Sequence, residues 1–160
     1  MQIPSLAELK KELSFLSEKE LISLITDLSK LSRDNKAYLY FKMNEKFDPR
    51  LFVDSVKEEL DEAFDSVNTG NYYYTKKSAQ AIRRKLNKAL KLSKNKADQV
   101  ELILYFCEKL KDHGFLDFRH PVITNLFNIQ IGKAQRILES LHVDLQADFQ
   151  FKLEELKDFN

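Results

Sequence analysis

The chain contains only three glycines and three prolines among its 160 residues. Tight hairpins and turns use both residue types freely, whereas the interiors of helices exclude them. This scarcity favours long helices. Apolar residues also recur at helical spacing along the chain, and no strand-like alternation exceeds four residues. We therefore predict an all-α fold.

Length and composition indicate the number of domains, the cellular compartment and whether the chain has a membrane segment. A chain of 160 residues fits one domain and buries enough surface to fold without a metal or a disulfide. The single cysteine, Cys107, has no partner for an internal bridge, which fits a reducing compartment. No apolar run reaches the length of a membrane span. We expect a cytoplasmic protein with no membrane segment and no bound cofactor.

Two capping-box motifs open the chain. Ser5 and Glu8 form the first, and Ser17 and Glu20 form the second. Leucines and isoleucines follow each motif at helical spacing. The pattern predicts two short antiparallel helices joined by a turn near Leu16.

The next two helices are expected on either side of an Asp-Pro pair. A third helix should begin near Asp34 and stop before Asp48. We predict that Asp48 caps the fourth helix and that Pro49 is its first residue, where a missing N–H costs nothing. The apolar spacing predicts that this helix buries Phe52, Val53, Val56, Leu60, Phe64 and Val67.

The segment 68–71 is the clearest break in the chain. A basic helix is expected after it, from about Lys76 to Ser93. The helix over 100–110 is apolar on all sides, so we expect it to lie at the centre of the fold and to end at Gly114.

Two further helices complete the predicted fold. One should start at Pro121 and run to about His142, with a possible interruption at Gly132. A last short helix is expected from Asp144 onwards.

These elements predict about seven helices in stacked antiparallel hairpins, as an irregular bundle or as a short α–α superhelix. We expect a single all-helical domain over 1–160. Within it, 1–67 would hold the N-terminal helices, 76–113 the basic and central helices, and 121–160 the C-terminal helices.

Three stretches carry a resemblance: LAELKKEL, LSEKELISLITDL and AYLYFK, between Leu6 and Lys42. Together with SAQAIRRKLNKALKL in the middle of the chain, they resemble an uncharacterised family of small bacterial all-helical proteins. The similarity covers roughly the first 110 residues. It implies a helical fold and implies no activity, substrate or site residue.

The net charge of +1 hides an uneven distribution. Residues 66–97 contain nine basic and no acidic side chains, whereas 1–65 and 98–160 each carry a net charge of −4. Ala79, Ile82 and Leu86 mark a buried side of the basic helix, which leaves Arg84, Lys88 and Lys91 with Lys77 on the opposite face.

Two interpretations of the basic face remain open. It could bind nucleic acid or another anionic partner. Alternatively, the acidic row of the preceding helix could neutralise it, because consecutive helices usually pack antiparallel. That row consists of Asp54, Glu58, Asp61 and Asp65.

The start of the basic helix suggests a smaller site. With Thr75 as the helix cap, Lys76 and Lys77 would lie in the first turn, where the helix dipole disfavours cations. Free N–H groups and two lysines there could bind a phosphate-like group. The candidate binding residues are therefore Thr75, Lys76, Lys77, Arg84, Lys88 and Lys91. Tyr72, Tyr73 and Tyr74 could stack on bases or could anchor the loop.

No catalytic or metal motif is readable. Glu139 and His142 have the spacing of half a di-iron site, but no second half follows. Cys107 lies in the most apolar helix, where a thiol usually serves packing. We predict a non-catalytic protein–protein interaction module, with binding of nucleic acid or an anionic partner through 75–94 as the alternative.

Overall fold

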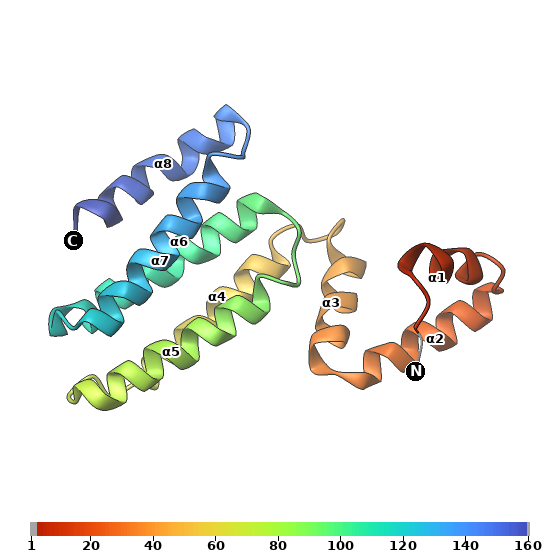
Figure 1. Cartoon of the computed structure of the whole chain (residues 1–160), viewed down its shortest axis with the longest axis horizontal. Helices are drawn as coiled ribbons and strands as arrows, with labels where there is room; N and C mark the ends of the chain where they lie inside the picture. The colour runs from red at the N-terminus through yellow and green to blue at the C-terminus, as the bar shows by residue number, and fades with distance from the viewer. Residues whose placement is uncertain (1–2, 160) are drawn as a thin grey trace. The chain divides into compact units, whose positions relative to one another are not determined.

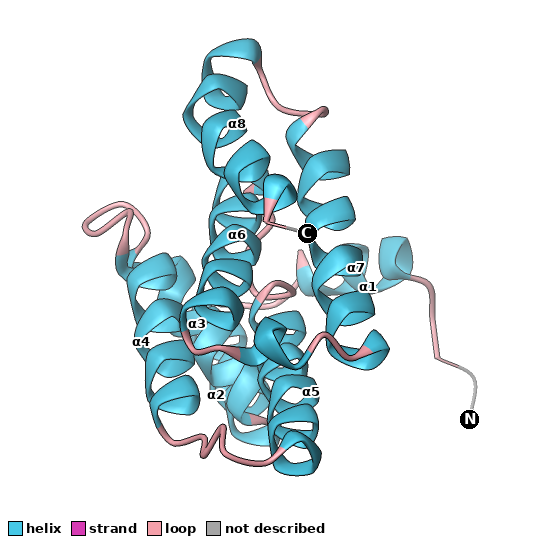
Figure 2. Ribbon diagram, turned by 90° about the vertical axis from the view of Figure 1, so that its left-hand side faces the viewer, coloured by secondary structure: helices cyan, strands magenta, loops and turns pink. Residues whose placement is uncertain are grey.

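The computed structural model describes residues 3–159, and these residues form eight α-helices and one short 3-10 helix, with no strand among them (Figures 1 and 2). The all-α prediction is confirmed, and the number of helices is close to the predicted seven. None of the helices within 3–159 is long and apolar enough to cross a membrane.

The chain divides into two compact units, 1–43 and 44–160, where the sequence analysis expected one domain. The expected N-terminal group 1–67 is divided between them. Its fourth helix packs with the helices that follow it, in the second unit.

The N-terminal unit contains α1 (Leu6–Leu13), α2 (Glu18–Leu31) and most of α3 (Arg33–Asn44). Both predicted capping boxes are formed: the Ser5 and Ser17 hydroxyls accept from the backbone N–H groups of Glu8 and Glu20, whose carboxylates accept in return. The Asn35 side chain donates to the Leu28 carbonyl oxygen at 2.9 Å, which joins α3 to α2. None of the three helices contains a buried residue.

The second unit is built around α6 (Lys96–Asp112). It packs against α4 (Leu51–Asp65), α5 (Tyr72–Ala89), the 3-10 helix η1 (Phe115–Phe118), α7 (Pro121–Leu138) and α8 (Val143–Asp158). Seven residues of α6 are buried, and Figure 1 shows α4 and α5 side by side, next to α6 and α7. The prediction that this helix is central is confirmed.

The end of α6 follows from its sequence. Gly114 adopts a left-handed conformation with φ of 71°, directly after the capping residue His113. Glycine takes this conformation without the steric cost that a Cβ adds. The chain then turns into η1, whose Phe115 and Leu116 are buried.

Several predicted boundaries are wrong. Asp48 does not cap α4, which begins at Leu51. The Asp48 carboxylate instead accepts from the N–H of Arg50 at 3.1 Å, in a turn before the helix. The helix α7 is not interrupted at Gly132. Val67 lies beyond α4 and is only half-buried, whereas the five other apolar residues predicted for α4 are buried.

Candidate functional site: the basic face of α5

The helix α5 begins one turn earlier than the sequence suggested. Asn71 is the N-cap, and its side-chain oxygen accepts from the N–H of Tyr73 at 2.8 Å. Thr75 is therefore inside the helix, fully buried, and its hydroxyl donates to the Asn71 carbonyl at 2.9 Å. The prediction that Thr75 caps the helix is wrong. An asparagine directly before three tyrosines was the signal for the true cap.

This earlier start also moves two lysines. Lys76 and Lys77 lie in the second turn, past the free N–H groups of the helix N-terminus. The Lys77 Nζ lies 4.4 Å from the centroid of the Tyr73 ring, and the Lys76 Nζ lies 5.8 Å and 5.9 Å from the Tyr72 and Tyr73 rings. The lysines thus contact aromatic faces, which attract cations.

The rest of α5 has the predicted orientation. Ala79, Ile82 and Leu86 are buried against the second unit, together with Thr75. Opposite them, one exposed row runs along the helix at spacings close to multiples of 3.6 residues. We call it the basic face; its residues are Tyr73, Lys77, Arg84, Lys88 and Lys91, flanked by Tyr74 and Lys85.

The three tyrosines separate into two roles. The Tyr72 ring stacks on His120 with centroids 4.0 Å apart and contacts Phe118, and its hydroxyl bonds to the His120 Nδ1. Tyr72 therefore anchors the start of α5 to the η1–α7 connection. Tyr73 and Tyr74 are 51% and 63% exposed, with ring centroids 5.5 Å apart in an edge-on arrangement.

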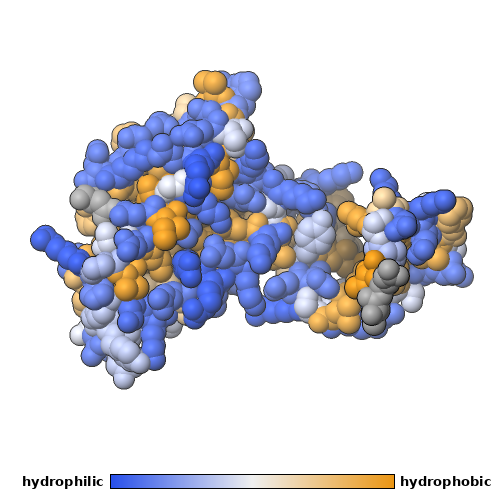
Figure 3. Space-filling view, viewed as in Figure 1, coloured by the Kyte–Doolittle hydropathy of each residue, from blue (hydrophilic) through white to orange (hydrophobic). Residues whose placement is uncertain are grey.

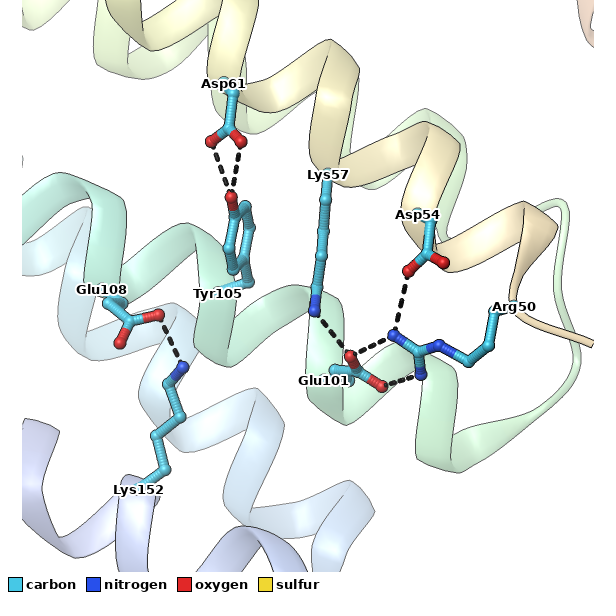
Figure 4. A network of polar contacts seen from close by, with 8 residues as sticks. All are labelled: Arg50, Asp54, Lys57, Asp61, Glu101, Tyr105, Glu108 and Lys152. Carbon is cyan, nitrogen blue, oxygen red and sulfur yellow. Dashed lines mark hydrogen bonds and ion pairs between the residues drawn. The ribbon is translucent and has the colours of Figure 1, made fainter.

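Three of the four members of the acidic row of α4 have ion-pair or hydrogen-bond partners outside α5: Asp61 and Asp65 contact α6, and Asp54 pairs with Arg50 directly before α4. Figure 4 shows the contacts of Asp54 and Asp61. Asp61 accepts from the Tyr105 hydroxyl at 2.7 Å and pairs with Lys109 at 2.8 Å. Asp65 lies 3.2 Å from the His113 Nε2, and Asp54 lies 3.1 Å from Arg50. The interpretation in which this row neutralises the basic helix does not hold for these three carboxylates, because α6 and Arg50 supply their partners.

The strongest electrostatic cluster joins α4 to α6 and was not found in the sequence. Glu101 accepts from both terminal nitrogens of Arg50, at 2.7 and 2.8 Å, and from Lys57 at 2.6 Å (Figure 4). Hydrogen bonds from Arg50 outweigh the effect of burial and, with Lys57, lower the pKa of Glu101 to about 2. Arg50 and Lys57 lie 51 and 44 residues before Glu101 in the sequence, so no local sequence pattern indicates this cluster.

Burial and hydrogen bonding also act in opposite directions on the pKa of a second carboxyl, Asp61, which contacts α6 one turn further along. Partial burial pushes the pKa of Asp61 upward, but hydrogen bonds from Lys109 and Tyr105 and the Lys109 charge bring it below its ordinary value. Lys152 of α8 pairs with Glu108 on another side of α6 (Figure 4). The charged side chains in these ion pairs around α6 therefore serve to hold the helices together.

The candidate catalytic groups have structural roles. Cys107 is fully buried, and burial raises the pKa of its thiol well above the ordinary value, which opposes thiolate formation. His142 is the N-cap of α8. No group of three or more potential metal-binding side chains occurs in the part of the chain that the structure describes.

A second unusual surface lies on the N-terminal unit. Thirteen of the 21 exposed large apolar side chains among the described residues belong to its 43 residues, and eight belong to the other 117. Figure 3 shows apolar side chains, in orange, on this unit. The exposed leucines of α1 and α2 are Leu6, Leu9, Leu13, Leu24, Leu28 and Leu31.

Comparison of the chain with protein-family models, curated proteins and solved structures found no match. The family resemblance drawn from the sequence therefore stays a prediction.

Proposed function

We propose that the protein is a non-catalytic protein–protein interaction module and that its N-terminal unit carries the contact surface. The observation behind this proposal is that α1, α2 and α3 bury no residue, although α1 and α2 present regular apolar rows. Apolar surface concentrated in this way is typical of an interaction site.

The size of the unit supports the need for a partner. Segments of about 40 residues or fewer rarely hold a hydrophobic core without a disulfide, a metal or association with another chain. The N-terminal unit has 43 residues and no cysteine. Association is therefore the expected source of its stability.

The partner that fits this surface is a second copy of the chain. Leu21, Leu24, Leu28 and Leu31 of α2 have the 3–4–3 spacing of a coiled-coil seam, and Leu6, Leu9 and Leu13 of α1 have the first part of the same spacing. Such a seam is self-complementary in an antiparallel pair, as a two-fold interface requires. The unit carries seven basic and six acidic side chains, so two copies do not repel each other.

The absence of a catalytic role is part of the proposal. The Cys107 thiol supports it, since this group is fully buried and not available to a substrate. The resemblance to a bacterial all-helical family and a cytoplasmic location also remain proposals. A buried free thiol fits a reducing compartment.

Light scattering coupled to size-exclusion chromatography tests the proposal on the full chain. We expect a species near twice 18.8 kDa whose share rises with protein concentration. Leu28→Asp places a charge in the seam and should weaken association at least about tenfold. Leu145→Asp is the matched control, since Leu145 lies on α8 with 42% exposure against 47% for Leu28.

A wild-type chain that stays near 18.8 kDa at every concentration would contradict the proposal. So would equal effects of the two substitutions on association. Circular dichroism of both variants should show that the chain remains predominantly helical.

A further inference from the structure

The basic face of α5 has no acidic counterpart in its own sequence segment, because residues 66–97 contain nine basic and no acidic side chains. The row Lys77, Arg84, Lys88 and Lys91 is exposed along α5 and the turn that follows it. Fourteen residues separate the first and last of these cations, a distance of about 21 Å at the helical rise.

The nearest acidic helix does not remove this charge. Asp61 and Asp65 on α4 are paired with Lys109 and His113 of α6, and Asp54 is paired with Arg50. Within residues 3–159, Arg84, Lys85 and Lys88 form no ion pair. Arg83, at the edge of the face, has a buried Nε–H without a hydrogen-bond acceptor among the same residues.

Aromatic rings continue the cationic row. Tyr73 lies one helical turn before Lys77 in the same row, and Tyr74 flanks it. Both rings are more than half exposed, whereas Tyr72 is held by His120. The hydrogen bond and the charge of Lys77 lower the pKa of the Tyr73 hydroxyl, consistent with a close contact between the two side chains.

A row of cations that ends in exposed aromatic rings suits a chain of phosphates with unpaired bases. The phosphates of a strand attract lysine and arginine, and each base presents a flat face for stacking. The bases of a duplex are stacked on one another, so a single strand offers free base faces beside its phosphates. The combination therefore favours a single strand over other polyanions.

We propose that α5 binds single-stranded nucleic acid, with Arg84, Lys88 and Lys77 on phosphates and Tyr73 and Tyr74 stacked on bases. Thr75 is buried and therefore has no part in this site. Lys76 adds its positive charge to the site from its position beside the tyrosine rings. The site lies in the second unit and does not depend on the leucine rows of the N-terminal unit.

Fluorescence anisotropy with a labelled oligothymidylate tests the cationic row on the full chain. Arg84→Gln with Lys88→Gln should weaken binding about tenfold at low salt and reduce the slope of log Kd against log salt by about 1.4. Lys10→Gln with Lys19→Gln removes two exposed cations from the N-terminal unit and is the charge-matched control, which should bind as the wild type does.

A second pair of variants tests the stacking role. Tyr73→Ala with Tyr74→Ala should weaken binding about fivefold or more, whereas Tyr73→Phe with Tyr74→Phe keeps the rings and should not. Circular dichroism confirms that each variant is folded.

Four results would overturn the proposal. The first is that the wild type does not bind the oligothymidylate at low salt, and the second is that the Arg84/Lys88 variant binds it as tightly as its control does. The third is that the wild type binds a duplex with equal affinity and the tyrosine-to-alanine changes have no effect. The fourth is that the protein binds phosphatidylserine vesicles but not the oligothymidylate.

Discussion

Glu101 of α6 links the start of α4 to α6 through hydrogen bonds from Arg50 and Lys57. Its side chain is 22% exposed and accepts from Arg50 and Lys57, so its negative charge is stabilised in the folded state. Its folded pKa of about 2 lies below its ordinary value of 4.5. A depressed carboxyl pKa stabilises the fold above the unfolded pKa, and this contribution is lost as the pH falls toward the folded pKa.

Replacement of Glu101 by glutamine should therefore lower the free energy of unfolding at pH 7, on the order of 2 kcal/mol, because solvent around the half-exposed Arg50 screens part of the pairing. The difference from wild type should shrink between about pH 5 and pH 2. Urea unfolding at several pH values measures this, with the exposed Glu58→Gln as the control. A gap that stays constant across this range would contradict the assigned role of Glu101.

Residue-scale features were predictable from the sequence where the partners are near neighbours. Ser5 with Glu8 and Ser17 with Glu20 formed as expected, because three residues fix their geometry. The cap of α5 was misplaced because both Asn71 and Thr75 are good caps by residue type, and burial of Thr75 follows from packing.

At the scale of elements, glycine is favourable at the end of a helix that needs a left-handed conformation and unfavourable in the interior of a helix. Gly114 needs its left-handed conformation at the end of α6, and an added Cβ would lie 3.0 Å from the Asp117 Oδ2. Gly132 lies within α7, and an added Cβ there would meet no atom within 4 Å.

Alanine at these two positions should have effects of opposite sign. Gly114→Ala should destabilise the protein by about 1 kcal/mol, and Gly132→Ala should stabilise it by about 0.5–1 kcal/mol. Thermal unfolding of the two variants compares them directly, each acting as control for the other. A shift of both melting temperatures in the same direction would count against this description of the two sites.

The orientation of helices about their axes was only partly predictable. The buried side of α5 followed from its apolar spacing, because Ala79, Ile82 and Leu86 repeat on one side. The direction of the acidic row on α4 did not. Sequence order suggested α5 as its neighbour, and only the packed structure brings Tyr105, Lys109 and His113 of α6 against it.

At the scale of the whole molecule, the two units differ in how they use apolar residues. The second unit buries its rows around α6, whereas the N-terminal unit leaves Leu24, Leu28 and Leu31 exposed. A row of apolar residues at helical spacing has the same sequence pattern whether it packs within its own chain or against another chain. For this reason the sequence indicated helices in both units and did not indicate which rows lack a partner.

Hydrogen exchange of the full chain at low and high protein concentration shows whether the N-terminal unit associates with a second copy. We predict that amide protection over α2, Glu18–Leu31, rises with concentration, because the seam becomes buried only in the pair. Amides of the central helix α6, already buried, should exchange at the same rate at both concentrations. Exchange over α2 that is independent of concentration would contradict the account.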